Sequence, residues 1–595
     1  MTACAARPGV CRGGVALRTG VVASLAWLAS FGTCPHTWAA ATQAYRVEIE
    51  APPALRGLLE ANLDLVRWST RQTVDEDQIR QLFKTAPRQV RELLATEGYF
   101  SPAVDAQLGM DKDGLVARLQ VSPGDPTRVT DVQLSFTGEL EAAREAEARD
   151  GFGLKIGSVF RQPDWAAAKA APLRSLQRRR YAGARLASSE AAVDPPSRSA
   201  RLKATFDVGP PFRFGALRVT GLQRYPRHVV ANLNPIAAGT PYDEAALLRF
   251  QRRLQLSGYF ASVIVSSPAD PAMAEASPID VTVVEGAARR LEAGAGLSTD
   301  RGPRAQIQYT DKNTFDRALR FSGGLRVDRL SHEAVGGLSM PRNAAGRVWG
   351  LEGKSNFQDI QGEQRSNWSA TLARSYTIET EESQQSLQFL TERRVLASGE
   401  QDNRQALFLM QTWRWNDLDD ILAPRNGRHL TLQIGGASRS LLSTRSFYRS
   451  EGRATFLKSF SAKTTLVFRT QVGAVFADSR DNIPAAYLYR TGGDASLRGY
   501  ALDSLGVEEG GAIVGGRYLA VASLELIRWL KKEWGAAVFT DAGNAVDDVS
   551  AFKAVHSVGV GARWSSPVGS LNLDVAYGEA VRDWRLHFGA GIVLR

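Results

Sequence analysis

The chain has 595 residues, of which 44% are hydrophobic and 23% charged, and its formal net charge is +11. This length exceeds that of one ordinary domain, and the apolar content excludes a chain that is disordered throughout. The 54 glycines follow no Gly-x-x period and the 25 prolines are not in excess, which excludes a collagen-like protein. We therefore expect several folded domains that are rich in strands and turns.

Residues 1–41 have the pattern of a secretory signal peptide. A basic region precedes the apolar stretch Gly20–Gly32, and the small residues Ala39–Ala41 follow, after one of which cleavage is expected. Removal of this segment takes away three arginines and no acidic residue, so the net charge falls from +11 to +8. It also removes every cysteine, which excludes disulfides, cysteine zinc sites and a cysteine nucleophile; the cysteines are Cys4, Cys11 and Cys34.

The first half of the chain contains an internal repeat with a period of about 80 residues. A tyrosine closes a helix-like stretch three times, at nearly equal intervals. A glycine followed by arginine at the fourth position after it recurs three times with a similar period, and a third motif occurs twice with the same period. These markers are Glu97–Phe100, Arg180–Gly183 and Ser257–Phe260; Gly124/Arg128, Gly209/Arg213 and Gly286/Arg290; and Gly157–Phe160 with Gly239–Tyr242.

Each repeat has the pattern of a small α/β unit. Thr73–Glu76 is interpreted as a capping box, and Pro241 suits the first position of a helix, so a helix is predicted after each. Apolar residues recur at helical spacing, as at Leu247 and Leu254, and extended segments such as Val116–Val121 flank the helices. The predicted unit is a strand, two helices and two strands.

This order resembles the polypeptide-transport-associated (POTRA) domain, a periplasmic module of order β-α-α-β-β. The resemblance implies three copies, which span residues 42–125, 126–207 and 208–288. The repeat alone would be equally compatible with three generic α/β domains that have only structural roles.

The second half of the chain, residues 289–595, shows an alternation of period two instead of helical spacing. Apolar residues alternate with polar or small ones along Leu430–Ile434, Leu571–Tyr577 and Trp584–Leu594. A soluble sandwich would show the same alternation, but the signal peptide and about 305 residues of strand and turn favour a membrane barrel. No run of about 18 apolar residues follows the signal, so a span would have to be such a closed barrel.

A barrel strand with its turn takes roughly 19 residues, which predicts about 16 strands. The predicted fold is therefore a series of α+β repeats followed by a transmembrane antiparallel β-barrel over residues 289–595.

We find no catalytic, cofactor-binding or metal-binding motif, so the chain is not predicted to be an enzyme. Asp419 and Asp420 are adjacent but lie beside turn residues, which favours a solvated loop. The basic net charge favours contact with anionic lipid or lipopolysaccharide over contact with nucleic acid. The histidines outside the signal are isolated and are interpreted as structural; they are His228, His332, His429, His556 and His587.

Three motifs late in the chain carry the most specific signal: Gly492–Tyr500, Val538–Asn544 and Gly559–Trp564. In this order, behind repeated α/β modules, they closely resemble the BamA/TamA superfamily of outer-membrane insertases and two-partner secretion transporters. The resemblance implies an extracellular loop that folds back into the barrel, with a tip formed by Arg498, Gly499 and Tyr500. It also implies a seat for that tip on two strands, formed by Phe539, Asp541, Gly543, Gly559 and Gly561.

The residue chemistry agrees with such a loop. A guanidinium inside a barrel requires an anionic partner, and Asp541 supplies a carboxylate on a strand with small neighbours. Gly499 permits a tight turn. The alternative is that Arg498 lies exposed in a flexible loop while Asp541 faces water.

Closure of the barrel requires its first strand, near Leu291–Ser298, to meet its last, near Trp584–Leu594. Glycines weaken side-chain packing along strands, so a glycine-rich seam is expected to open laterally. The same glycines would also suit barrel curvature. The four glycines of this predicted seam are Gly294, Gly296, Gly589 and Gly591.

Three modules, a barrel of about 16 strands and this length resemble the TamA branch of the superfamily. The resemblance implies the assembly of client proteins, such as autotransporters, into or across the outer membrane without covalent catalysis. It also implies a TamB-type partner anchored in the inner membrane, and an N-terminal arm in the periplasm. One departure is the ending Val593–Arg595, where many outer-membrane strands end in an aromatic residue.

Three other functions stay open at this point. A two-partner secretion transporter would pass its client through the lumen. A passive porin or receptor would not need the repeated arm, and a barrel-bound hydrolase would need a catalytic set that the sequence does not offer.

Overall fold

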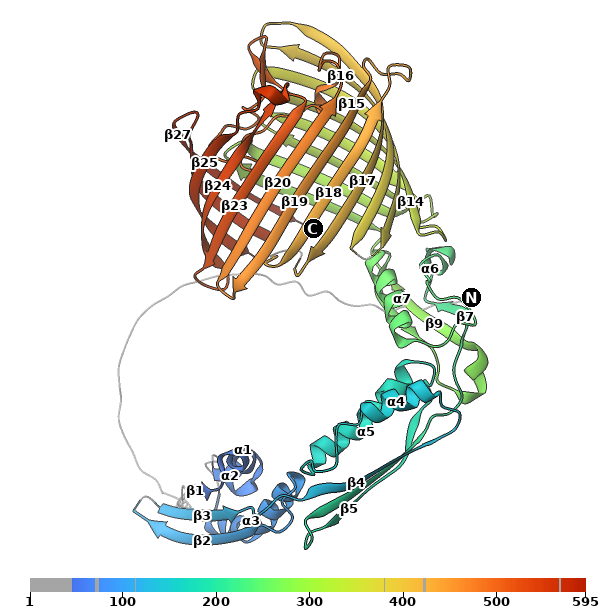
Figure 1. The fold of residues 1–595 in the computed structure, drawn as a ribbon, viewed down its shortest axis with the longest axis vertical. Helices are drawn as coiled ribbons and strands as arrows, with labels where there is room; N and C mark the ends of the chain where they lie inside the picture. Colours follow the sequence, from blue (N-terminus) through green and yellow to red (C-terminus); the bar gives the residue numbers. More distant parts are fainter. Residues whose placement is uncertain are drawn as a thin grey trace, which may run out of the picture. The chain divides into compact units, whose positions relative to one another are not determined.

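The computed structural model describes residues 45–69, 74–112, 114–378, 380–420, 424–566 and 569–594. The predicted signal peptide, residues 1–41, lies outside the described residues. Three small sheets with their helices precede a closed barrel (Figure 1). Among the described helices, none is both long enough and apolar enough to cross a bilayer.

The first module has helices packed on a three-stranded sheet of order β1-β3-β2, in which β1 is parallel to β3 and β2 is antiparallel to it. Its core joins the helix residues Leu59, Ile79 and Leu94 to Leu119 on the central strand, all nearly or fully buried. The elements are β1 (Tyr45–Glu50), α1 (Pro53–Asn62), α2 (Asp64–Ser69), α3 (Glu76–Thr96), β2 (Ala103–Asp111) and β3 (Gly114–Ser122).

The next two sheets repeat that strand order, β4-β6-β5 and β7-β9-β8. The second set comprises β4 (Arg128–Thr137), α4 (Ala142–Asp150), α5 (Gln162–Arg178), β5 (Arg185–Asp194) and β6 (Ser199–Asp207). The third comprises β7 (Phe214–Thr220), α6 (His228–Ala231), α7 (Glu244–Leu256), β8 (Phe260–Ser266) and β9 (Ser277–Glu285).

Two predicted helix starts were wrong by a few residues. The helix α3 is capped by Asp75, whose side chain forms a capping box with Gln78, while Thr73 lies outside the described residues. The helix α7 starts at Glu244 after the cap Asp243, so Pro241 precedes it. In both cases the side chain of an aspartate immediately before the helix accepts a backbone N–H of its first turn: Asp75 from Gln78, and Asp243 from Ala245.

The repeated sequence markers lie where one module meets the next. Gly98 adopts a left-handed backbone with φ +93°, and its carbonyl accepts a hydrogen bond of 2.8 Å from the amide of Thr127. Arg180 occupies the matching position with φ +64°, and its carbonyl accepts a hydrogen bond of 2.6 Å from the amide of Phe212. The period of the repeat therefore reflects a repeated joint as well as a repeated core.

The third marker contacts the barrel instead of another module. The hydroxyl of Tyr259 donates to the carbonyl of Ala318, 3.1 Å away, in the turn that follows the second barrel strand. Arg320 donates to the carbonyl of Ser257 across 3.1 Å. This contact identifies the barrel end that lies beside the third module, here called the module end; the opposite end is called the far end.

The barrel has sixteen antiparallel strands among the described residues, which confirms the predicted architecture and number. They are β10 (Arg289–Ser298), β11 (Gly302–Thr314), β12 (Leu319–Asp328), β13 (Ser331–Ser339), β14 (Arg347–Ile360), β15 (Glu363–Ile378), β16 (Glu381–Leu396), β17 (Gln401–Leu418), β18 (Gly427–Ala437), β19 (Phe447–Ser461), β20 (Thr464–Phe476), β23 (Tyr518–Trp529), β24 (Trp534–Val546), β25 (Val555–Ser566), β26 (Gly569–Gly578) and β27 (Asp583–Leu594).

The first and last strands close the barrel through a short pairing, here called the seam. Among the described residues, β10 and β27 pair over six positions, whereas β15 and β16 pair over sixteen. In the seam Gly296 faces Gly591, and Gly589 faces Ser298. Gly294, the remaining predicted seam glycine, faces Val593.

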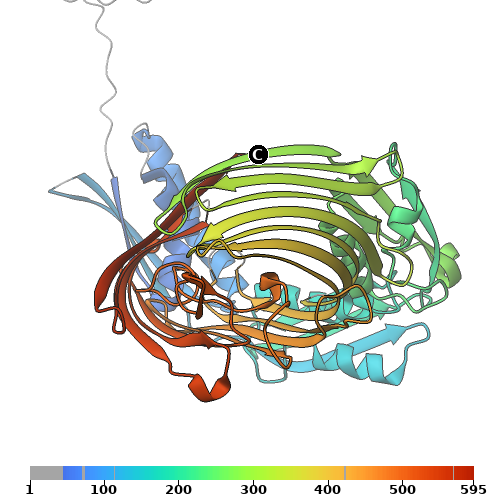
Figure 2. The same ribbon diagram turned by 90° about the horizontal axis from the view of Figure 1, so that it is seen from above.

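A long segment, residues 477–517, connects β20 to β23 at the far end and contains the hairpin of β21 (Val507–Glu509) and β22 (Ala512–Val514). Figure 2 shows the barrel strands as a ring, with this orange segment within its outline. Many of its side chains are buried, including Leu497 and Tyr500. The segment is therefore folded into the lumen, and its interior contacts define the candidate site.

Candidate functional site

The centre of the site is Arg498, which is only 2% exposed although it lies in the long segment between β20 and β23. Its Nε and Nη2 each lie 2.8 Å from a carboxylate oxygen of Asp541 on β24, a bidentate pair. The amide of Arg498 also donates to Asp541 across 3.1 Å. Charge-assisted bonds of this kind fix the position of the loop as well as neutralising both groups.

Two further carboxylates complete the surroundings of Arg498. Its Nη1 lies 2.8 Å from Glu525 on β23 and 3.3 Å from Asp574 on β26. Arg563 on β25 bridges the same two carboxylates, and Arg469 on β20 lies 3.3 Å from Glu525. Three cations thus face three carboxylates, so the cluster is close to neutral overall and can be buried.

Of the residues predicted to seat the loop tip, Phe539 contacts Arg498 directly, whereas Gly559 and Gly561 act by leaving space for other side chains. The guanidinium of Arg498 stacks on the ring of Phe539, 3.3 Å from the centroid, as a cation–π contact. A β-carbon at Gly559 would collide with that ring, and one at Gly561 would collide with Asp574. These glycines therefore make room for the groups that hold the loop and do not touch its tip.

The remaining predicted seat residue, Gly543, packs against the neighbouring strand, because a β-carbon there would collide with the carbonyl of Ala520. The tip itself rests on Gly578, which lies close to Gly499. Gly499 has φ +87°, a backbone conformation that favours glycine, as the predicted tight turn requires. Tyr500 is 1% exposed and its hydroxyl donates to the carbonyl of His556 across 2.8 Å.

A second set of contacts fastens the loop to both strands of the seam. The amide of Gly499 donates to Nε2 of His587 on β27, 2.9 Å away, which places the imidazole proton on Nδ1. That Nδ1 lies 3.7 Å from Asp300, in the turn after β10, and Asp300 accepts a 2.8 Å bond from the amide of Asp494. We call Asp300, Asp494 and His587 the seam latch.

The turn after β10 also extends the seam itself. The amide of Thr299 donates to the carbonyl of Phe588 across 2.9 Å, and the Thr299 hydroxyl accepts from the Phe588 amide across 3.1 Å. Burial raises the pKa of the Asp300 carboxyl, but the neighbouring His587 imidazole and the bond from the Asp494 amide outweigh it and lower that pKa. Burial and the neighbouring Asp300 raise the pKa of Asp494.

The same segment is held on the opposite wall by a separate group of charges. Arg490 lies 3.1 Å from Glu363 on β15 and donates to the carbonyl of Ile513 across 2.8 Å. Glu509 on β21 accepts from Arg394 on β16 across 2.9 Å. The loop is therefore attached to two sides of the lumen.

Sequence reasoning located Arg498 and Asp541 but missed Glu525, Asp574 and His587. All three occupy inward positions in strands with clear alternation, so their burial could have been inferred. Their convergence on the loop tip depends on the pairing of strands that are distant in sequence. No cluster of metal-ligating side chains occurs within the part of the chain that the structure describes.

Comparison with known families gives two matches. Residues 284–593 match the Omp85 superfamily domain, and residues 212–286 match the surface antigen variable number repeat, or POTRA. Together they cover the third module and the barrel.

Among solved structures, the chain is similar to BamA from Haemophilus ducreyi lacking POTRA domains 1–3, with a TM-score of 0.67, 15% identity, and coverage of 78% of this chain and 100% of that one. It also aligns with CdiB from Acinetobacter baumannii, with a TM-score of 0.45, 12% identity, and coverage of 79% and 91%. CdiB from Escherichia coli gives 0.45, 12%, and coverage of 92% and 99%. The BamA likeness, together with the POTRA match, confirms the predicted fold class.

Proposed function

The chain belongs to the Omp85 superfamily and is an outer-membrane β-barrel protein with periplasmic POTRA modules, and from this premise we propose that it assembles client proteins into or across the outer membrane. The work is non-covalent, and the free energy comes from client folding. The observation that carries this proposal is the short seam, which pairs over six positions up to Leu594, the last described residue, and is fastened to the loop tip. Few strand contacts have to break for such a seam to open. A buried contact between Gly499 and His587 joins it to the loop tip.

The proposed route begins with the modules, which we assign to residues 42–125, 126–207 and 208–288. The edge strands β2, β5 and β8 each border a three-stranded sheet, and an extended client segment can add to such an edge through main-chain hydrogen bonds. The client then pairs with a free edge of the opened seam. Three modules with this barrel support a TamA-like role, with autotransporters as clients and a TamB-type partner.

The test is a reversible lock on the seam. Ser298→Cys with Gly589→Cys places a disulfide at facing positions of β10 and β27. The matched control is Ala373→Cys with Ser386→Cys, a facing pair of β15 and β16. Each pair is expressed in cells that lack the wild-type chain, and disulfide formation is read from gel mobility with and without reductant.

We expect the oxidised seam pair to stop client assembly, measured from the outer-membrane proteome, and reductant to restore it. The oxidised control pair should leave assembly unchanged, because that wall stays closed in this mechanism. Wild-type assembly with a fully oxidised seam would contradict the proposal.

A secretion transporter is the second candidate because the lumen contains a polar cavity of about 520 Å3. Lys354, Arg453, Arg490 and Asp503 are among the residues that line it. A client that passes through the lumen must displace the loop but not the seam. Secretion that continues with the seam oxidised would therefore favour this function over insertion.

A further inference from the structure

On the outer surface of β14–β17, the outward side chains change from apolar to polar toward the far end of the barrel. At one level, facing positions of the four strands carry a row of exposed leucines: Leu351, Leu372, Leu387 and Leu409. Four positions nearer the far end, which is the extracellular end, the same outward face carries Ser355, Trp368, Thr391 and Gln405. Two positions further, it carries Phe357, Ser366, Arg393 and Asn403.

These rows identify where the hydrocarbon ends. Outward side chains within the bilayer core are apolar, and aromatic residues gather at its boundaries, so the leucine row lies in the core and Trp368 lies at its outer edge. The step from the leucine row to Phe357 spans roughly 20 Å along the strand and about 15 Å in height at the usual tilt. The polar rows therefore stand at the level of the outer-leaflet headgroups.

The length of the strands supports this placement. β14 to β17 have 14, 16, 16 and 18 residues, whereas about 9 to 11 residues suffice to cross a bilayer. Part of this wall must then stand beyond the hydrocarbon, where sugars and phosphates surround it.

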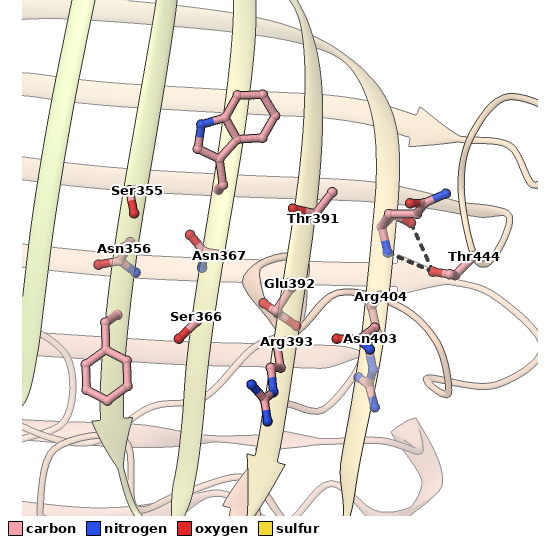
Figure 3. Close-up of a pocket in the computed structure, with 13 residues that line it drawn as sticks. Ser355, Asn356, Ser366, Asn367, Thr391, Glu392, Arg393, Asn403, Arg404 and Thr444 are labelled. Carbon is pink, nitrogen blue, oxygen red and sulfur yellow. Dashed lines mark hydrogen bonds between the residues drawn. The ribbon is translucent and has the colours of Figure 1, made fainter.

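The polar rows line a shallow depression of about 540 Å3 on this wall (Figure 3). Trp368 is 49% exposed within it. Among the described residues, the side chains of Ser355, Ser366, Thr391 and Asn403 make no hydrogen bond to another residue. This contrasts with the lumen, where the polar side chains of the loop site are extensively paired.

Charge distinguishes between the headgroups that could fill the depression. Arg393 is the exposed cation there and already donates to Gln401 across 2.9 Å. The carboxylate of Asp359, outward on the next row, accepts from Gln364 across 3.0 Å. One cation near one carboxylate gives a weak site for a simple anion, whereas uncharged hydroxyl and carboxamide groups beside an indole suit a sugar ring.

We propose that this depression binds the saccharide headgroup of an outer-leaflet glycolipid. The indole of Trp368 packs on the C–H face of a sugar, and the hydroxyls and the Asn403 carboxamide bond its hydroxyl groups. Arg393 contacts a phosphate carried by the same sugar. The acyl chains of the lipid lie along the leucine row below.

The site is confined to one side of the barrel. Toward the extracellular end of the seam, the outward side chains are the exposed Leu297 of β10 and Trp584 and Leu586 of β27. These side chains offer no polar group beyond the indole N–H. A bound glycolipid would therefore be held at the long strands β14–β17, here called the tall wall, and would be absent from the seam. This binding role is separate from client assembly and does not depend on it.

The test uses the full-length protein in lipid nanodiscs. Binding is measured for four probes: intact lipopolysaccharide, its core oligosaccharide without acyl chains, a phospholipid with matched chains, and inorganic phosphate. The variants are Trp368→Ala and Asn403→Ala. The control is Trp349→Ala, which removes another exposed outward tryptophan nearer the module end of the same wall. Unchanged gel mobility of the folded barrel verifies that each variant is assembled.

We expect the wild type and Trp349→Ala to bind the lipopolysaccharide and the oligosaccharide. Trp368→Ala should weaken both by at least tenfold and Asn403→Ala by several-fold. Failure of the oligosaccharide to bind the wild type, or equal binding by Trp368→Ala, would overturn the proposal. Full competition by inorganic phosphate would also overturn it, because the site would then recognise only an anion.

Discussion

Two sides of the barrel, the β15–β16 wall and the seam, differ in the length over which their strands pair. β15 and β16 pair over sixteen positions, whereas the seam strands β10 and β27 pair over six within the described part of the chain and place Gly296 opposite Gly591. Each pair of facing residues adds backbone hydrogen bonds and side-chain contacts, so the tall wall resists separation far more than the seam. If the barrel opens during client assembly, as proposed above, the seam is the place where opening disrupts the fewest strand contacts.

The loop between β20 and β23 is anchored on two sides of the lumen, and the two anchoring carboxylates differ in the number of arginines near them. Asp541 is paired with one cation, Arg498, among the described residues. Glu363 on the tall wall has three, Arg490 at 3.1 Å, Arg365 at 3.5 Å and Arg394 at 3.9 Å. Loss of a single arginine is therefore expected to matter more at the first anchor than at the second.

The largest effect is expected for Arg498→Ala. This change leaves the buried Asp541 without its cation, and breaking such a pair costs about 3 kcal/mol in the lower part of the usual range. We expect increased protease cleavage within residues 492–504 of the folded, membrane-inserted protein, and reduced client assembly. Asp541→Ala should behave alike, and the double variant should be less affected than the two changes added together. Wild-type cleavage and assembly in Arg498→Ala would contradict the role of the cluster.

Arg490→Ala provides the comparison on the tall wall. Glu363 retains Arg365 and Arg394, so the expected loss in unfolding free energy is about 1 to 2 kcal/mol. Cleavage should increase near the hairpin at residues 507–514 and stay at the wild-type level near Arg498. An equal increase at both places would show that the loop responds as one unit, and the proposed difference between the two anchors would be wrong.

The seam latch is expected to have an effect of similar or smaller size. His587→Ala leaves the buried amide of Gly499 without its acceptor, at a cost of about 1 kcal/mol. Hydrogen exchange at Gly499 and Thr299 should accelerate together, because both report on the far end of the seam. His587→Gln, which can supply a carbonyl oxygen, should restore part of the protection. Faster exchange at Gly499 alone would mean that the loop and the seam are uncoupled.

An effect of similar size, but confined to the third module, is expected for Glu285, which precedes the first seam strand. Burial raises the pKa of its carboxyl, but bonds from the amides of Gln223, Arg224 and Tyr225 and from the Arg224 side chain outweigh it and lower that pKa to about 2. Because the folded pKa lies below the unfolded value of about 4.3, the stabilisation is present above pH 4.3 and is lost as the pH falls toward 2.

Exchange protection of those three amides should therefore decline between pH 4.3 and 2, and Glu285→Gln should reduce it at neutral pH by about 1 kcal/mol. The glutamine variant should show no decline over the acidic interval. A decline of the same size in both proteins would assign the pH dependence to another group.

The strand alternation, the barrel size and the Arg498 motif could be predicted from the sequence because each depends on local periodicity or on short motifs. That Gly559 and Gly561 make room for Phe539 and Asp574 could not, since it depends on cross-strand register. The latch was missed for the same reason: Asp300 follows the first barrel strand, His587 lies on the last, and the two meet only when the barrel closes. The helix starts were wrong where an aspartate two positions after the predicted residue serves as the cap, as Asp75 and Asp243 do.

The joints marked by the repeat have a consequence for how such a protein can change in evolution. Gly98, Arg180 and Gly258 follow equivalent helices with a left-handed backbone. The carbonyls of Gly98 and Arg180 accept from a backbone amide of the next module, and the carbonyl of Gly258 accepts from the Lys312 side chain of the barrel. A repeat that is duplicated or deleted would therefore be gained or lost together with its own connecting residues. The modules that become neighbours would still meet through the same type of backbone contact. The number of modules in the arm can therefore change by one without a new type of interface. The number of barrel strands cannot change so easily, because every strand has to pair on both sides for the barrel to close.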